Sequence, residues 1–278
     1  MPRFLPLLLT PWIAVACAGC GDSAGEARAV RRAQEEARHQ TREEEANELL
    51  HRSDDPATIA DKVVKAHGGA KSLAKWHAGY LRYKFSGDII PFPGLQAEIE
   101  ETYQLPDKIR RVITGRSKTR FESTTFLKDG NKRQLFDRSG GQLRKELPPA
   151  VGDERPFIFM FDLRPLLDSS TKREVAGEGY VQGRPTIIMI VEAKEFPPVR
   201  IFLDKKNGLV VKAERNLPAP GPDNKNKLEI YYDDYSERDG LMMPFRITYK
   251  HGEHPLLEWT LVEARPIPSP DPAVFQKP

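Results

Sequence analysis

The pattern of apolar and polar residues divides the chain into three parts. Residues 21–55 contain no aromatic side chain and almost no large apolar one before Leu49 and Leu50. Residues 56–78 place apolar side chains at helical spacing. From residue 79 onward, apolar and polar side chains alternate with a period of two. The chain therefore predicts a polar N-terminal stretch, a short helical region and a β-rich remainder.

Two short helices are expected before the β-rich part. Asp55 followed by Pro56 is typical of a helix start, because the carboxylate can cap the first N–H groups and proline fits the first turn. Gly68 and Gly69 predict the end of this helix. A second helix is expected over residues 70–76.

Strands are expected from residue 80 to residue 264. In residues 80–90, Leu81, Tyr83 and Phe85 alternate with polar side chains, which is typical of a half-buried strand. Glycine-containing turns separate such segments, and no strand–helix–strand succession suggests parallel pairing. We expect about ten or eleven antiparallel strands in consecutive hairpins. Residues 157–167 interrupt this rhythm and predict one or two buried helical turns broken at Pro165.

The expected fold class is mainly β (α+β). A long, twisted antiparallel sheet must curl to bury one face, so we expect an open half-barrel over residues 56–278. The N-terminal and mid-chain helices are the natural cover for its concave side. We predict a cavity lined by Leu81, Tyr83, Phe85, Ile89, Ile99 and Tyr103. The alternative is an ordinary core in which helix side chains fill the same space.

Residues 1–19 are typical of a lipoprotein signal peptide. A short apolar run follows Arg3, and the small residues Ala18 and Gly19 precede Cys20. This ending resembles the bacterial lipobox, although Cys17 stands where leucine is usual. The resemblance implies that Cys20 is diacylated and becomes the first residue of the mature chain. Cleavage before Cys17, or a plain signal peptide without lipid, are the alternatives.

Charge and cysteine content narrow the class of protein. The formal net charge of +3 argues against a nucleic-acid partner. Cys17 and Cys20 are the two cysteines of the chain, so the domain must be stable without a disulfide. Residues 21–60 contain 6 Lys+Arg and 10 Asp+Glu, a net of −4. Residues 20–55 are therefore expected to form a tether, either a solvated helix or a flexible segment, between membrane and domain.

The sequence contains few motifs that indicate a catalytic, cofactor-binding or metal-binding site. No nucleophile elbow and no phosphate-binding loop occur, so we expect no enzyme, cofactor or metal. His251 and His254 lack a nearby third metal ligand, and a solvated turn explains them better. An apolar loop, with Ile90, Phe92 and Leu95, links two strands where polar residues are usual. This loop either touches membrane or cargo, or folds back onto the sheet.

Three stretches together resemble the LolA/LolB-like superfamily, the outer-membrane lipoprotein-sorting-like proteins of the bacterial envelope. They are the helix–Gly–Gly–helix–strand opening at residues 66–80, the hairpin at 202–209, and the Tyr-Asp-Asp-Tyr and Asp-Gly-Leu-Met-Met-Pro segments within 232–249. The likeness covers residues 56–278. It implies a half-barrel with an apolar cavity that carries or senses lipids or lipoproteins, without catalytic residues. No ligand-contacting residue of the family can be matched to a position here.

Two functions follow from these expectations. The first is a non-enzymatic, membrane-anchored envelope lipoprotein that binds an acyl chain, lipid or lipoprotein in its cavity. The second is a structural or interaction lipoprotein with a filled interior and no ligand. A hydrolase is disfavoured because no nucleophile set is present. Both functions imply an exported protein of the bacterial cell envelope, lipid-anchored and facing the periplasm, on either the inner or the outer membrane.

Overall fold

The computed structural model describes residues 48–278 except 90–91, 117–120, 130–131, 138, 144–162, 193–197, 217–226 and 253, together with residues 30, 33 and 34. The chain divides into two units, Met1–Asn47 and Glu48–Pro278. The expected signal peptide and Cys20 lie outside the described residues. The second unit begins at Glu48, so residues 48–55, which we assigned to the tether, are part of the domain.

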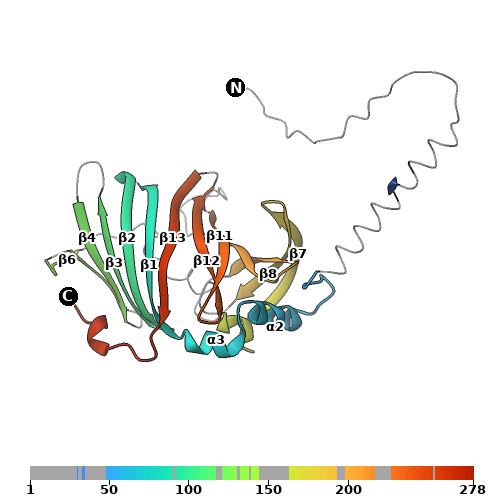
Figure 1. Cartoon of the computed structure of the whole chain (residues 1–278), viewed down its shortest axis with the longest axis horizontal. Helices are drawn as coiled ribbons and strands as arrows, with labels where there is room; N and C mark the ends of the chain where they lie inside the picture. Colours follow the sequence, from blue (N-terminus) through green and yellow to red (C-terminus); the bar gives the residue numbers. More distant parts are fainter. Residues whose placement is uncertain are drawn as a thin grey trace, which may run out of the picture. The chain divides into compact units, whose positions relative to one another are not determined.

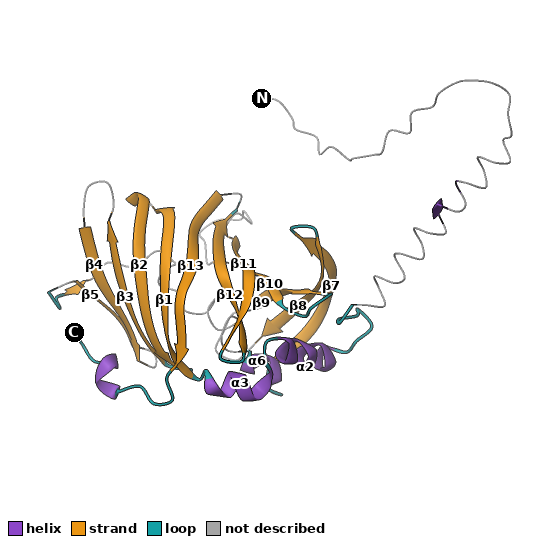
Figure 2. Ribbon diagram, viewed as in Figure 1, coloured by secondary structure: helices purple, strands orange, loops and turns teal. Residues whose placement is uncertain are grey.

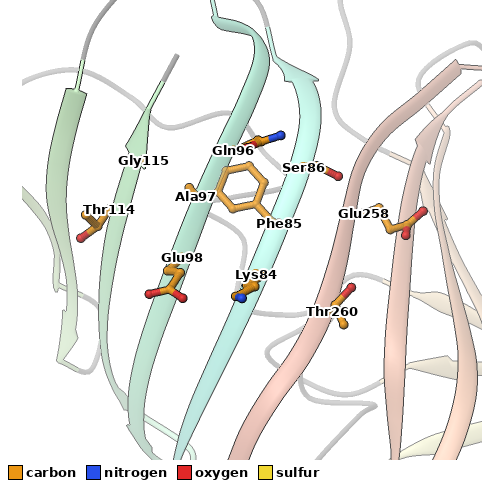
Figure 3. Close-up of a pocket in the computed structure, with 10 residues that line it drawn as sticks. All are labelled: Lys84, Phe85, Ser86, Gln96, Ala97, Glu98, Thr114, Gly115, Glu258 and Thr260. Atoms are coloured by element: carbon orange, nitrogen blue, oxygen red, sulfur yellow. The ribbon is translucent and has the colours of Figure 1, made fainter. Parts of the chain in front are cut away.

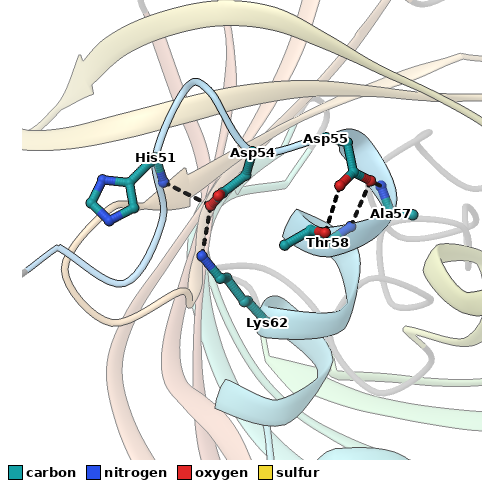
Figure 4. Close-up of polar contacts among 6 residues, drawn as sticks. All are labelled: His51, Asp54, Asp55, Ala57, Thr58 and Lys62. Atoms are coloured by element: carbon teal, nitrogen blue, oxygen red, sulfur yellow. Dashed lines mark hydrogen bonds and ion pairs between the residues drawn. The ribbon is translucent and has the colours of Figure 1, made fainter.

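The N-terminal helices lie where the sequence predicts them. The Asp55 carboxylate accepts hydrogen bonds from the backbone N–H groups of Ala57 and Thr58, each at 3.0 Å, and so caps α2 (Pro56–Ala66; Figure 4). Gly68 follows with a left-handed φ of 109°, which only glycine adopts freely. The chain then turns directly into α3 (Gly69–Lys75).

One antiparallel sheet contains the thirteen strands of the described residues (Figures 1 and 2). They are β1 (Ala78–Ile89), β2 (Phe92–Gln104), β3 (Lys108–Arg116), β4 (Phe121–Asp129), β5 (Lys132–Asp137), β6 (Gln142–Leu143), β7 (Lys172–Val181), β8 (Arg184–Glu192), β9 (Val199–Asp204), β10 (Val210–Asn216), β11 (Lys227–Arg238), β12 (Leu241–His251) and β13 (His254–Pro266). These thirteen strands exceed the ten or eleven that we expected, and the shortest is the two-residue β6. The curled, unclosed sheet confirms the expected half-barrel.

The strand order shows how the half-barrel is assembled. It runs β6-β5-β4-β3-β2-β1-β13-β12-β11-β10-β9-β8-β7, so β6 and β7 are the two edges. Consecutive hairpins account for every pair except β1 with β13, the first and the last strand of the chain. These two strands meet in the middle of the sheet. No local pattern in the sequence predicts this pairing.

Three helices cover one end of the β7–β12 side of the sheet (Figure 2). The main contacts of α2 are with α3, α6 (Arg164–Leu167) and β7, and α3 packs against β12. Leu163 and Leu166 are buried in the core beside them. Pro165 lies within α6 and does not interrupt a helix, which corrects our expectation. The rest of the expected helical stretch, residues 157–162, lies outside the described residues.

The C-terminal tail packs back onto the sheet. Asp271 caps the short helix η1 (Pro272–Phe275), which contacts β3 and β4. The ring of Phe275 is buried, and the Nζ of Lys108 lies 5.8 Å from its centre. The Nζ of Lys277 lies 5.7 Å from the ring centre of Phe136. The tail therefore stabilises the β3–β5 end of the sheet.

Candidate functional site

The first and third stretches of the LolA/LolB-like resemblance meet where the helices dock on the sheet. A Cβ at Gly68 would lie 1.9 Å from the backbone oxygen of Gly240, which is in the turn between β11 and β12. The N–H of Met242 donates to the carbonyl of His67 at 3.2 Å. Two glycine turns far apart in sequence thus touch through their backbones.

His67 forms the buried centre of this junction. Its Nδ1–H donates to the carbonyl of Val63 at 2.9 Å, and its Nε2 faces the N–H of Val210 at 3.5 Å. The ring stands edge-on to Tyr235, with 5.8 Å between ring centres. Burial lowers the pKa of His67 to about 4, although the hydrogen bond to Val63 opposes this. His67 is therefore a neutral packing residue with both ring nitrogens engaged.

The second stretch of the resemblance, the β9–β10 hairpin, joins the same assembly. A Cβ at Gly208 would lie 2.9 Å from the side chain of Leu49 and 3.1 Å from that of Ala66. The carbonyl of Lys205 accepts hydrogen bonds from the N–H groups of Leu49 and Leu50, at 2.8 and 2.9 Å. All three stretches thus mark the docking of the N-terminal segment and helices on the sheet.

The predicted cavity-lining residues do share one buried face. Five of them pack in a single apolar cluster, namely Leu81, Tyr83, Phe85, Ile99 and Tyr103, and none is more than 4% exposed. The side chain of the sixth, Ile89, lies outside the described residues, and so do those of Ile90, Phe92 and Leu95 in the apolar loop. This face is either the wall of a cavity or the core of the domain.

A buried ion pair lies on the same face, and our sequence analysis missed it. Glu101 of β2 is directly opposite Arg111 of β3. Its Oε2 accepts a hydrogen bond from Nε of Arg111 at 2.6 Å and forms an ion pair with Nη2, also at 2.6 Å; the two side chains are 2% and 0% exposed. Residue 101 has the same parity as Ile99 and Tyr103, so strict alternation was the signal that could have found it.

Aromatic rings enclose the guanidinium of Arg111. It lies 5.9 Å from the ring centres of both Phe126 and Trp259. Trp259 in turn lies 5.4 Å from the ring of Tyr83 and 5.3 Å from that of Tyr249. The charge pair is therefore held in an aromatic surrounding, where water competes little for it.

We call the buried ionisable side chains of this face the interior polar cluster: Tyr83, Glu101, Tyr103, Arg111 and Tyr249. Burial, and then the charge of Glu101, raise the pKa of Tyr83 well above its ordinary value, so its phenol stays neutral. The hydroxyl of Tyr103 donates to the carbonyl of Trp76 at 3.2 Å and so joins the cluster to the end of α3. The indole Nε1 of Trp76 is buried and has no hydrogen-bond partner among the described residues.

A groove of about 480 Å³ crosses β3, β2, β1 and β13 (Figure 3). Seven of its ten lining residues are solvent-exposed polar side chains, namely Lys84, Ser86, Gln96, Glu98, Thr114, Glu258 and Thr260. The other three, Phe85, Ala97 and Gly115, are buried members of the alternating rows. This groove is open and is lined mainly by polar residues, and it is not the cavity that we predicted from Leu81, Tyr83, Ile99 and Tyr103.

The part of the chain that the structure describes shows neither a metal site nor a membrane-spanning helix. There, no group of three or more His, Cys, Asp or Glu side chains could hold a metal ion. The side chains of His251 and His254 lie outside that part. None of the described helices combines the length and apolar character needed to cross a membrane.

Comparisons with known proteins identify the fold. No family model and no curated protein matches the chain. A LolA superfamily protein from Nitrosomonas europaea superposes with a TM-score of 0.56 at 12% identity, over 81% of this chain and 99% of that chain. The protein has a LolA-like fold. A DUF1329 family protein from Desulfovibrio piger is also similar, with a TM-score of 0.51 at 11% identity, over 80% of this chain and 98% of that chain.

The LolA-like fold confirms the resemblance drawn from the three sequence stretches. Nearly the whole of each matched structure is covered, so the likeness includes the complete half-barrel and not a local motif. At 12% and 11% identity it establishes the architecture alone. A function must therefore be argued from the interior face.

Proposed function

We propose that this protein is a non-enzymatic lipoprotein of the bacterial cell envelope that binds an acyl chain, a lipid or a lipoprotein in its half-barrel. One observation carries the proposal: a LolA-like sheet presents a largely apolar and aromatic face over β1, β2 and β13, interrupted by the Glu101–Arg111 pair. The main contacts of the covering helices are with β7 and β12 instead. An acyl chain is the ligand whose chemistry fits such a face, because its binding is driven by burial of apolar surface.

Copurified lipid is the first test. The protein should be isolated from membranes in an amphipathic polymer without detergent exchange, and native mass spectrometry should then detect a bound lipid. After delipidation, a fluorescent acyl probe should bind with a stoichiometry of one ligand per chain. A protein that carries no lipid and binds no probe would refute the proposal.

Matched substitutions test where the ligand lies. Ile99→Ala changes a residue of β2, in the part of the interior face that we assign to the ligand. Ile201→Ala changes an equally buried residue of β9, in the opposite half of the sheet. A tight core predicts a loss of about 2–5 kcal/mol in the free energy of unfolding for both. If Ile99 lines a cavity, its substitution costs clearly less than that of Ile201, and it alone alters probe affinity.

The alternative function is a structural or interaction lipoprotein with a filled interior. Complete burial of the large side chains Trp76, Tyr249 and Trp259 favours this alternative. It predicts equal stability losses for Ile99→Ala and Ile201→Ala, together with no probe binding by the parent protein. One set of measurements therefore separates the two functions.

The proposed anchor is diacylated Cys20, with the domain facing the periplasm and lipid or lipoprotein cargo as partner. Cys20→Ser should move the protein from the membrane to the soluble fraction, because two acyl chains give stable anchoring. Release by Cys17→Ser in place of Cys20→Ser would assign the lipid to Cys17. Retention of both variants in the membrane fraction would contradict a lipid anchor.

A further inference from the structure

The interior polar cluster places polar and charged side chains on the β1–β3 face, and their charges cancel. Its two full charges, on Glu101 and Arg111, are 2.6 Å apart and compensate each other. The phenols of Tyr83 and Tyr249 lie beside them and are buried. The face is therefore polar at this point but carries no net charge.

Trp76 adds an unused donor beside this cluster. Its side chain is fully buried, and its Nε1–H has no hydrogen-bond partner among the described residues. The hydroxyl of Tyr103 donates to the backbone carbonyl of Trp76, and the side chain of Trp76 belongs to the same buried cluster as Tyr83 and Tyr103. An unsatisfied buried donor destabilises the fold and calls for an explanation. A ligand acceptor would satisfy it.

We propose that the bound amphiphile carries an uncharged polar group, such as an ester, an amide or a hydroxyl, that rests against the interior polar cluster and accepts a hydrogen bond from Trp76 Nε1–H. This inference rests on the proposed function and specifies its class of ligand. It favours acylglycerols and acylated cargo over free fatty acids and anionic phospholipids.

Charge compensation is the physical reason for this selectivity. A carboxylate or phosphate placed here would find Arg111 already neutralised by Glu101 and would bring an unpaired charge into an apolar interior. That cost is high, because a buried charge is stable only when paired. An ester or hydroxyl brings no charge, and it can accept the indole N–H that otherwise has no partner.

The test compares two ligands with the same acyl chain. A neutral fluorescent acyl probe bound to the delipidated protein is displaced by monoolein or by oleate, at alkaline pH where the carboxylate is ionised. Wild-type protein should bind monoolein at least about tenfold more tightly than oleate. Oleate binding as well as monoolein, or better, would overturn the inference while leaving the proposed function intact. Failure of the probe to bind at all would refute both.

Two variants locate the selectivity. Glu101→Gln leaves the charge of Arg111 uncompensated and should shift the preference toward oleate. Arg215→Gln is its matched control, because Arg215 is also buried but belongs to β10, in the opposite half of the sheet. The control should keep the wild-type preference. If Arg215→Gln and not Glu101→Gln changed it, the polar group would lie at β10 and the inference would be wrong.

A third variant tests the donor independently, in case Glu101→Gln does not fold. Trp76→Phe removes the indole N–H and keeps an aromatic ring. It should weaken the binding of monoolein about fivefold, which corresponds to the loss of one hydrogen bond. The affinity for the hydrocarbon part of the probe should not change. Unchanged monoolein affinity in a folded Trp76→Phe protein would contradict the proposed role of this residue.

Discussion

The two sides of the half-barrel are stabilised in different ways. On the β7–β12 side, helices dock through close backbone contacts, of which Gly68 against Gly240 is the tightest. On the β1–β5 side, the interior face is held by side chains, with the Glu101–Arg111 pair enclosed by aromatic rings. The backbone contacts on the helix side leave no room for an added atom. The side-chain contacts of the interior face depend on the pairing of charges and on side-chain volume. Substitutions on the two sides should therefore have different consequences.

The largest effect is expected for the buried ion pair. Arg111→Met leaves the carboxylate of Glu101 buried without its partner and should lower the free energy of unfolding by about 3–5 kcal/mol. The double variant Glu101→Met/Arg111→Met removes both charges and should recover most of this loss. Urea unfolding of the single and double variants measures both values. A double variant as unstable as the single one would show that the pair is not the source of the effect.

On the helix side, glycine contacts make the sharpest comparison. Gly68→Ala places a Cβ against the backbone of Gly240 at a left-handed φ, and it should cost about 2–4 kcal/mol. Gly69→Ala is the control, since Gly69 also has a positive φ but no atom lies within 4 Å of its Cβ position. We expect about 1 kcal/mol for the control, from backbone strain alone. Equal losses would mean that close packing at the junction is unimportant.

Truncation separates the tether from the domain. A chain that begins at Glu48 keeps the hydrogen bonds from Leu49 and Leu50 to the carbonyl of Lys205. A chain that begins at Arg52 loses them, together with the fully buried Leu50, and should be about 2–3 kcal/mol less stable. Thermal unfolding of the two truncated proteins and the full mature chain checks this. A stability loss already present in the Glu48 chain would place residues before 48 in contact with the domain.

Acid should weaken the helix side through His67. Its pKa is about 4 in the folded state, because burial disfavours the charged form, and about 6.5 in the unfolded chain. As the pH falls from 6.5 toward 4, the unfolded state takes up a proton that the folded state does not, so stability decreases. Between pH 7 and pH 5 the loss should be about 2 kcal/mol. His67→Gln should abolish this slope, while His77→Gln, at a half-buried position outside the core, should keep it.

The interior face shows how far prediction from sequence could reach. Alternation placed Tyr83, Phe85 and Ile99 on one buried face correctly, because a strand turns successive side chains to opposite sides. The same rule applied to Glu101 would have buried a carboxylate, and burial of a carboxylate is unfavourable unless it has a partner such as Arg111, which lies opposite on the neighbouring strand. Alternation along a strand can be read from neighbouring residues in the sequence. The partner of a buried charge depends on which strands lie side by side in the folded sheet.

Sequence alone determined the local elements of this protein: the Asp55–Pro56 helix start, the glycine turns and the alternating strands. Each depends on the conformational preferences of a few neighbouring residues. Only the tertiary structure decided that β1 pairs with β13, that Gly68 meets Gly240, and that Glu101 is buried against Arg111. These contacts join residues on different elements, and their free energy depends on which surfaces exclude water together, a quantity that no single segment contains.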